Sequence, residues 1–286
     1  MLELLALAIA PALFILLYIW KKDRYEPEPL HLITWVFFLG ALSTIPALIL
    51  EYPFPEGVFS SAVIAPVAEE LVKFSVVFLV MYRHPEFDEP MDGIVYATAA
   101  SLGFATVENI LYVLEGGIGV GILRALMSVP GHVIFSCIWG FALGMAKFPP
   151  ESSRVRIIFT GLFGAMLLHG IYNFSIEVLG VLALLVILVV IIPSGWWFTV
   201  RNIKKAHADP GSACSAMKNS GPGYLSYPSL MVISHPGPAL PQPIPDEHPN
   251  KETVPVQQSA VSGFCTACRT PYRQGTRFCE NCGKKI

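Results

Sequence analysis

The sequence has few charged residues for its length. Only 14% of its 286 residues are Asp, Glu, Lys or Arg, whereas soluble domains carry about 25%. Hydrophobic residues make up 53% of the chain, and its mean hydropathy is +0.57. A composition this poor in charge excludes an ordinary soluble domain and indicates an integral membrane protein.

Three sequence patterns are also missing. The first apolar run has no basic segment ahead of it and no small-residue cleavage site before Lys21, so we expect a retained span and not a signal peptide. The zinc-binding pattern His-Glu-x-x-His does not occur. No pair of inverted repeats with broken helices is evident, which counts against a secondary transporter.

Long apolar runs predict the fold class. About 20 helical residues cross a hydrocarbon core of about 30 Å, and continuous runs favour helices over the short alternating strands of a barrel. The predicted fold is an all-α polytopic membrane protein with about seven transmembrane helices, followed by a disordered linker and a small zinc ribbon. The spans are expected at about 2–20, 30–50, 58–82, 91–115, 123–147, 157–177 and 179–200.

Basic residues follow alternate spans, and the loops between those positions have none. Cytoplasmic loops of membrane proteins carry an excess of Lys and Arg. The pattern therefore predicts a multi-pass protein of the cell membrane with its amino terminus outside and its carboxyl-terminal tail in the cytoplasm. Arg124, at an outer helix end, is the exception. The basic residues are Lys21, Lys22, Arg24, Arg83, Lys147, Arg154, Arg156, Arg201, Lys204 and Lys205.

Composition divides the chain into three parts. A transmembrane domain is expected over residues 1–205. Residues 206–262 are rich in Pro, Gly and Ser with few aromatics, which predicts a disordered linker. A zinc ribbon is expected at 263–286.

Four cysteines in this last segment form two Cys-x-x-Cys pairs ten residues apart. Four thiolates so spaced suit tetrahedral zinc, and a unit this small needs such a metal to fold. The predicted cytoplasmic location favours zinc over disulfides. Because four sulfur ligands leave no open position, the zinc would be structural. The ligands would be Cys265, Cys268, Cys279 and Cys282.

Two adjacent acids, Glu69 and Glu70, interrupt the third apolar run. An ionised side chain near a bilayer centre costs roughly 2.5 to 3.5 kcal/mol, so such residues are usually functional. Lys73 follows at spacings of three and four, which places it on the same helix face as a counter-ion. An ion pair that only orients helices is the structural alternative.

Other spans carry polar residues at a similar depth. Counted at 1.5 Å per residue, Glu69 and Glu70 lie roughly 16 to 18 Å below the outer surface. Glu108, Asn109, His132 and His169 lie about 10 to 13 Å below it, and Asn173 lies one turn from His169 on the same face. Each alone could be a satisfied core residue or a polar contact between helices. Together they predict one site shared by four antiparallel helices. These residues are Glu108, Asn109, His132, His169 and Asn173.

The residue types suit hydrolysis. A buried glutamate beside a second carboxylate can take a proton from water, while His and Asn side chains donate hydrogen bonds to the oxyanion that forms at a carbonyl. The same residues could hold a divalent metal that activates its bound water. The residues alone leave both mechanisms open.

Five segments in order resemble the signatures of the PrsW family of intramembrane proteases, which is related to the CAAX-prenyl endopeptidases and their Glu-Glu motif. The resemblance covers about residues 15–178. The segments are KKDRYEPEPLHLITWVFFLGALSTIPALILE, APVAEELVKF, MDGIVYATAASLGFATVENILYV, PGHVIFSCIWGFALG and LLHGIYNF.

The resemblance implies hydrolysis of a peptide bond inside the membrane, in the best-known relatives the first cut of an anti-sigma factor that spans it. It implies that Glu69 activates water and that Glu70 is a support or second acid. Glu108, His132 and His169 would complete the site, and Asn173 would assist at the oxyanion. Lys73 and Asn109 are expected to support it. The family mechanism is described both as metal-dependent and as glutamate-based.

The tail lies outside the resemblance and leaves the substrate open. We expect a membrane-anchored protein substrate and a cytoplasmic partner for the zinc ribbon. The ribbon is basic, but a solvated basic face explains this better than nucleic-acid binding. Two other functions remain as alternatives at this point: a proton-coupled transporter or channel, and a non-catalytic scaffold that recruits partners through the ribbon.

Overall fold

A computed structural model describes residues 2–23, 26–147, 151–208, 263–264 and 271–272. The chain divides into two compact units, Met1–Asn219 and Ser220–Ile286. In the second unit, β1 (Gly263–Phe264) pairs antiparallel with β2 (Pro271–Tyr272). The four cysteines of the predicted zinc ribbon, and residues 209–262 of the predicted linker, lie outside the described residues.

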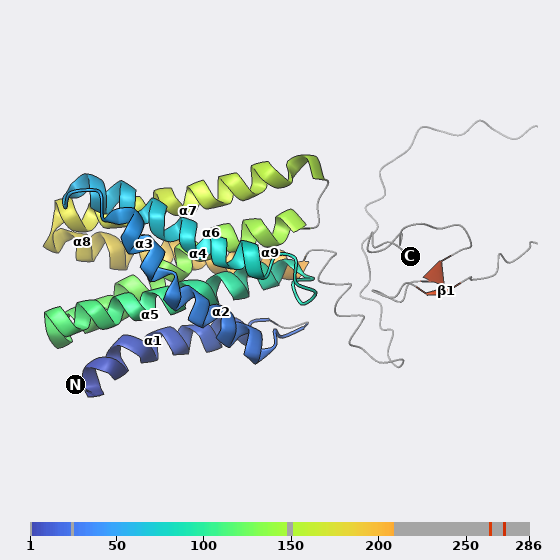
Figure 1. Cartoon of the computed structure of the whole chain (residues 1–286), viewed down its shortest axis with the longest axis horizontal. Coiled ribbons are helices and arrows are strands. Elements are labelled where there is room, and N and C mark those ends of the chain that lie inside the picture. Colours follow the sequence, from blue (N-terminus) through green and yellow to red (C-terminus); the bar gives the residue numbers. More distant parts are fainter. Residues whose placement is uncertain (1, 24–25, 148–150, 209–262, 265–270, 273–286) are drawn as a thin grey trace, which may run out of the picture. The chain divides into compact units, whose positions relative to one another are not determined.

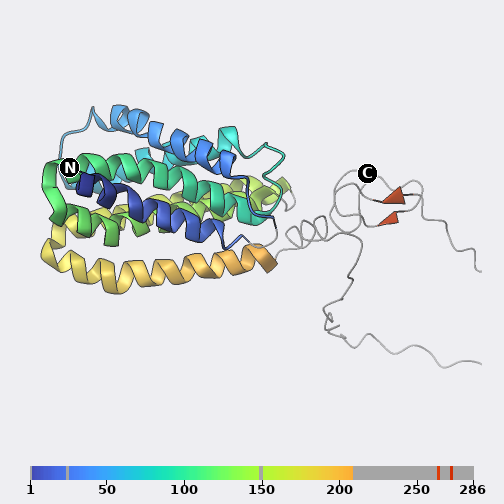
Figure 2. The same ribbon diagram turned by 90° about the horizontal axis from the view of Figure 1, so that it is seen from below.

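The first unit is helical, and its long helices run side by side (Figures 1 and 2). Apolar residues dominate these segments, as expected of helices that bury their backbone polar groups in lipid. Three segments, labelled η, have π-helical hydrogen bonding. The elements are α1 (Leu2–Trp20), α2 (Leu30–Leu42), α3 (Thr44–Glu51), η1 (Ser60–Ile64), α4 (Ala65–Val80), α5 (Pro90–Leu123), η2 (Arg124–Ser128), α6 (Val129–Lys147), α7 (Glu151–Leu179), α8 (Val181–Leu185), η3 (Val186–Ile191) and α9 (Ile192–Ala208).

Within the described residues, five helical segments are long and apolar enough to cross a membrane. The multi-pass helical membrane protein is therefore confirmed, whereas the count of seven spans stays a prediction. The predicted spans 91–115 and 123–147 fall in one segment, which is interrupted at Gly117, where φ is +70°. The predicted span 58–82, which carries three charges, is not among the five. The five are Leu2–Trp20, Leu30–Glu51, Pro90–Lys147, Ser153–Leu179 and Val181–Ala208.

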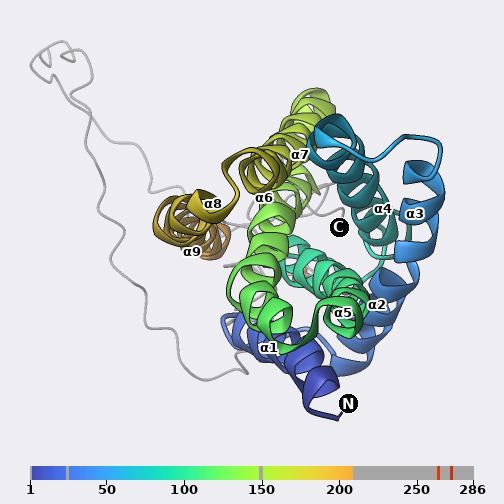
Figure 3. The ribbon, with the colours of Figure 1, turned by 90° about the vertical axis from the view of Figure 1, so that its left-hand side faces the viewer.

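Helix α6 lies inside the bundle and packs against α4, α5, α7 and α9 (Figure 3). Small residues allow its close approach to α5. A Cβ atom at Gly93 would clash with the backbone of Gly140 and Gly144, so glycine is needed at this crossing. Small residues spaced four apart are typical of helix contacts in membranes, where dispersion between closely packed backbones replaces the hydrophobic effect.

Two π-helical segments lead directly into helices that carry predicted site residues. Segment η1 ends one residue before α4, which holds Glu69, and η2 ends one residue before α6, which holds His132. Such wide turns are rare and occur frequently at functional sites. In this fold they lie at the ends of the helices from which the site is built.

Candidate active site

Glu70 is completely buried and surrounded by donors from three helices. Its Oε1 is 2.6 Å from Lys73 Nζ and 3.0 Å from His169 Nδ1, and its Oε2 accepts a 2.9 Å hydrogen bond from Trp139 Nε1. An ammonium at this distance makes a charge-assisted hydrogen bond. Both oxygens of Glu70 are thus occupied by protein groups.

Glu69 has different surroundings although it is the next residue. Its Oε2 is 3.4 Å from Lys73 Nζ and 4.0 Å from His169 Nε2. The second distance is beyond hydrogen-bonding range. A separation of about 4 Å leaves room for a water molecule that contacts both atoms. Successive helix residues point about 100° apart, so the two glutamates face different parts of the bundle.

Lys73 lies where the helical spacing predicts, on the face of both acids. Its Nζ is also 3.3 Å from His132 Nδ1, and the side chain is completely buried. Because an ammonium only donates hydrogen bonds, His132 Nδ1 accepts here. The imidazole proton is then on Nε2, which is 2.8 Å from Glu108 Oε2.

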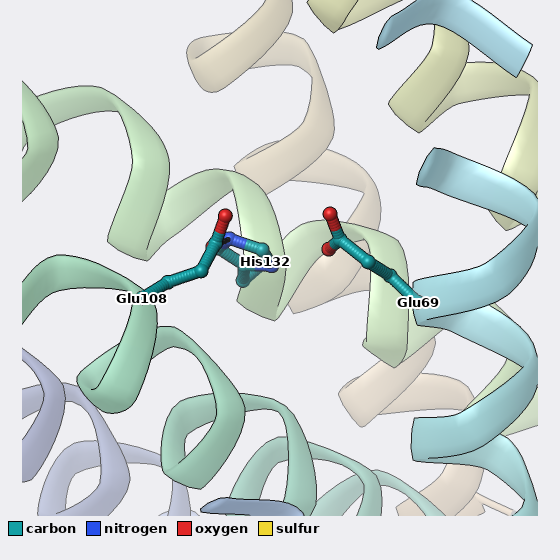
Figure 4. A group of neighbouring side chains, drawn as sticks. All are labelled: Glu69, Glu108 and His132. Carbon is teal, nitrogen blue, oxygen red and sulfur yellow. Dashed lines mark ion pairs between the residues drawn. The ribbon is translucent and has the colours of Figure 1, made fainter. Parts of the chain in front are cut away.

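Glu108 and His132 thus form one continuous polar chain with Lys73. In Figure 4 the carboxylates of Glu69 and Glu108 point toward each other, with His132 between them. Arg124 Nη2 donates a 3.0 Å hydrogen bond to Glu108 Oε2, and Arg124 Nε donates at 2.6 Å to Asn109 Oδ1. Arg124 therefore pairs with Glu108 as Lys73 pairs with Glu70.

His169 and Asn173 lie one turn apart on α7. The His169 ring stacks on Phe135 with centroids 4.5 Å apart, and its Nδ1 is held by Glu70. A carboxylate on one imidazole nitrogen orients the ring and directs the other nitrogen outward. Asn173 Nδ2 donates a 2.9 Å hydrogen bond to the Ser61 carbonyl in η1.

The candidate site contains a cavity of about 760 Å³, and only some of the predicted site residues line it. Glu69, Glu108, His132, His169 and Asn173 line it. The remaining predicted residues do not: they are Glu70, Lys73 and Asn109. Asn109 instead donates to the Ala8 carbonyl at 3.5 Å and so links α5 to α1. The lining residues can meet a substrate, whereas the others support them.

Two overlapping sets of side chains suit a divalent metal ion by their chemistry. Glu69, Glu108 and His132 each offer one ligand atom, and so do Glu69, Glu70 and His169. The three atoms of each set lie within 4.8 Å of one another, and carboxylate and imidazole are ligands that zinc takes in catalytic sites. The residues therefore fit a metal ion.

Sequence reasoning missed two residues of this arrangement. In the sequence, Arg124 stands out only because it is the one basic residue at an outer helix end. That exception could have indicated a buried acid nearby. Trp139 carries no signal, because an aromatic residue in an apolar helix is ordinary. Both are found only through their hydrogen bonds to Glu108 and Glu70.

Comparison with known proteins agrees with the arrangement. Residues 28–197 match the sequence model of one family, described as PrsW family intramembrane metalloprotease. Protease PrsW of Geobacillus kaustophilus (strain HTA426) is 39% identical over 215 residues, which are 72% of this chain and 93% of the relative. No solved structure matches the chain.

Two further relatives carry the same name. Protease PrsW of Bacillus subtilis (strain 168) is 35% identical over 73% of this chain and 97% of its own length. Protease PrsW of Clostridioides difficile (strain 630) is 33% identical over 71% and 91%. Among the functions that the sequence left open, these matches select a peptidase. The chain belongs to the PrsW family of intramembrane metalloproteases.

Proposed function

We propose that the cavity lined by Glu69, Glu108, His132 and His169 is where this intramembrane protease hydrolyses a peptide bond, and that Glu69 takes the proton from the attacking water. One observation carries the proposal. Of two adjacent buried glutamates, only Glu69 lines the cavity, while both oxygens of Glu70 are occupied by Lys73, Trp139 and His169. A general base must reach its water.

Glu70 is proposed as a positioning residue. It accepts from His169 Nδ1 and so directs His169 Nε2 toward Glu69, 4.0 Å away. Asn173 also lines the cavity, and its side-chain amide is the donor proposed to stabilise the oxyanion of the tetrahedral intermediate, whereas His132 already donates its Nε2 proton to Glu108. Lys73 and Asn109 support this arrangement from outside the cavity.

A metal ion is proposed to be held by Glu69 together with Glu108 and His132, because both oxygens of Glu70, a member of the other set, are already occupied by protein groups. The family description and the chemistry of these three side chains support this. A bound divalent ion polarises the scissile carbonyl and lowers the pKa of coordinated water. Arg124 on Glu108 would keep that ligand oriented.

The substrate is proposed to be a membrane-anchored regulatory protein of the anti-sigma kind. A site formed within membrane-crossing helices requires a substrate segment that enters the bilayer. Basic residues after alternate spans support an amino terminus outside the cell. The tail would then be cytoplasmic, with a structural zinc on Cys265, Cys268, Cys279 and Cys282 and a partner that this ribbon recruits.

The proposed role of Glu69 is tested by Glu69→Gln in the full-length protein, assayed on membrane-anchored substrates in native membranes. We expect cleavage to fall at least 100-fold, since general-base catalysis contributes roughly 10²- to 10⁴-fold, and uncleaved substrate to accumulate. Glu56→Gln is the matched control, because Glu56 is an exposed carboxylate that lines the same cavity. It should cleave normally. Full activity of Glu69→Gln would overturn the assignment.

A further inference from the structure

A second group of buried acids lies at the end of the bundle where α1 ends and α5 begins. It comprises Asp23, Glu89 and Asp92, here called the Asp92 cluster, and all three side chains are at most 3% exposed. Each offers one carboxylate oxygen, and the three oxygens lie within 4.8 Å of one another. Asp92 and Glu108 are separated by 16 residues of α5, about 24 Å along the helix, so the cluster is distinct from the candidate active site.

The backbone holds Asp92 in place. Its Oδ2 accepts hydrogen bonds of 2.7 Å from the N–H groups of both Asp88 and Glu89, as an acid in the first helical turn often does. Among the described residues, no Lys, Arg, side-chain amide or hydroxyl group donates to its Oδ1 or to either side-chain oxygen of Asp23. The Asp23 and Asp92 side chains instead face other carboxyls, those of Glu89 and Glu28 respectively. Buried carboxyl groups thus meet one another here, with one oxygen of each of the three side chains within 4.8 Å of the others.

Lys147 is close enough to interact electrostatically with Asp92, but it forms no ion pair with the cluster. Among the residues that the structure describes, neither Lys nor Arg forms an ion pair with any member of the Asp92 cluster. Lys147 donates instead to the Tyr82 carbonyl at 2.7 Å. A fourth acid, Glu28, lies nearby but is occupied by the Tyr96 hydroxyl, which donates to its Oε2. Unpaired buried carboxylates are costly unless they coordinate a cation or are protonated.

We propose that the Asp92 cluster binds a hard divalent cation such as Mg²⁺ or Ca²⁺, and that this cation joins the α1–α2 connection to the start of α5. These ions prefer carboxylate oxygens at about 2.0 to 2.6 Å. Two oxygens on one such ion lie at most about 4 to 5 Å apart, which agrees with the spacing of the cluster. The site contains only oxygen ligands and so differs in kind from the Glu/His set of the cavity.

A cation at the Asp92 cluster would also stabilise the fold by joining two connections. Asp23 follows α1, whereas Glu89 and Asp92 flank the start of α5, 66 residues later in numbering. A shared ion would tie these elements together where the two connections meet. Trp20 Nε1, which donates to the Glu28 carbonyl at 2.9 Å, already links α1 to the segment before α2.

The test uses full-length protein in detergent, freed of loosely bound metal, with Mg²⁺ and Ca²⁺ as probes at constant ionic strength. We expect millimolar Mg²⁺ or Ca²⁺ to raise the unfolding temperature of the wild type by several degrees, because an ion that binds only the folded state stabilises it. Asp23→Asn should abolish the shift. This isosteric change keeps the side-chain shape and removes a buried charge that no described Lys or Arg pairs, so folding should persist.

Two matched variants make the result specific. Glu86→Gln changes an exposed acid in the same connection and should keep the shift. Glu69→Gln alters the candidate active site and should keep it as well. Equilibrium dialysis with radioactive Ca²⁺ should show one ion fewer per chain in Asp23→Asn and in Asp92→Asn than in the wild type.

Three outcomes would overturn the proposal. The first is a wild-type protein whose unfolding temperature neither cation raises. The second is a shift of wild-type size in Asp23→Asn. The third is a shift lost in Glu69→Gln but kept in Asp23→Asn, which would place the ion at the cavity.

Discussion

The helical domain contains two groups of buried carboxylates that are compensated in different ways. At the candidate active site, Lys73 pairs with Glu69 and Glu70, and Arg124 pairs with Glu108. In the Asp92 cluster, the described residues supply no Lys or Arg partner. The first group therefore carries its own cations, whereas the second is proposed to take one from solution.

This difference shows what each region is suited to do. Lys73 and Arg124 hold Glu70 and Glu108 in position beside the cavity, as a site that moves protons requires. The Asp92 cluster touches neither the cavity nor its lining residues, and it joins two connections. We therefore assign the buried acids at one end of the bundle to chemistry and those at the other end to holding the fold.

The largest expected effect is the loss of cleavage when the metal of the cavity is removed, and it distinguishes that metal from the cation of the Asp92 cluster. Treatment with a strong chelator should lower substrate cleavage by at least 100-fold, and added zinc should restore it. Glu108→Gln should lower the zinc content by one ion per chain relative to the wild type, measured by elemental analysis. Asp23→Asn serves as the control and should retain that zinc. Chelated protein with full activity would contradict a metal-dependent mechanism.

Removing a charge from each region should have unequal effects on stability. Lys73→Met leaves Glu70 buried without its cation and should lower the free energy of unfolding by about 3 to 5 kcal/mol. Asp23→Asn, measured without divalent cations, should cause no loss, because it removes an uncompensated charge. Denaturant titration of both variants gives the comparison.

The double variant Lys73→Met/Glu70→Gln sharpens this test. It removes both members of the buried pair, so much of the lost stability should return. If the double variant is as unstable as Lys73→Met alone, the loss reflects packing of the lysine side chain and not an unpaired charge.

Arg124 is expected to have a smaller effect, on catalysis. Arg124→Gln removes the ion pair that holds Glu108 and should lower kcat about tenfold, equivalent to about 1.4 kcal/mol, with little change in KM. Arg124→Lys should recover part of this loss, since a lysine keeps the charge but cannot contact Glu108 and Asn109 together. A change confined to KM would indicate substrate binding instead of positioning.

The smallest expected effect is a pH dependence of stability that comes from Asp23 and Glu89 of the Asp92 cluster and from the neighbouring Glu28. Burial raises the pKa of Asp23 to about 7 and the pKa values of Glu28 and Glu89 to about 8. Unfolded carboxyls titrate near 4, so between about pH 4 and pH 8 the folded state binds more protons. Stability should therefore fall as pH rises through this range.

This dependence is measured as the unfolding temperature between pH 5 and pH 8 in a chelating buffer. The wild type should lose a few degrees, and Asp23→Asn should lose less because one of the titrating groups is gone. Added Mg²⁺ should flatten the wild-type curve, since the cation replaces the protons. A curve that rises over this range would contradict the burial of these acids.

Much of the site was predictable because membrane helices simplify the problem. Apolar runs place the helices, and polar residues inside them are few and costly. Spacings of three and four put Lys73 on the face of Glu69 and Glu70, and the structure has it there. Counting residues from the outer surface predicted that His132 and His169 share a level with the acids, and their rings lie 5.6 Å apart.

Sequence spacing could not separate the roles of neighbouring residues. Glu69 and Glu70 are identical in chemistry, and only the packing of α6 and α7 brings Trp139 and His169 onto one of them. The sequence likewise did not show that the two predicted spans 91–115 and 123–147 belong to one segment, Pro90–Lys147, whose backbone departs from helical geometry at Gly117. Arg124, the first residue of η2, lies 16 residues after Glu108 in sequence, and only the structure shows that its guanidinium contacts that carboxylate.

The sequence by itself determined the membrane class, most of the helical segments, the family and most of the polar residues of the candidate active site, because these depend on composition and on spacing along one helix. Only the tertiary structure decided which glutamate lines the cavity and that Asp23 meets Asp92. Those outcomes depend on how separate helices are rotated and brought together. Helical periodicity states which residues share a face, but the packing of neighbouring helices determines what that face meets.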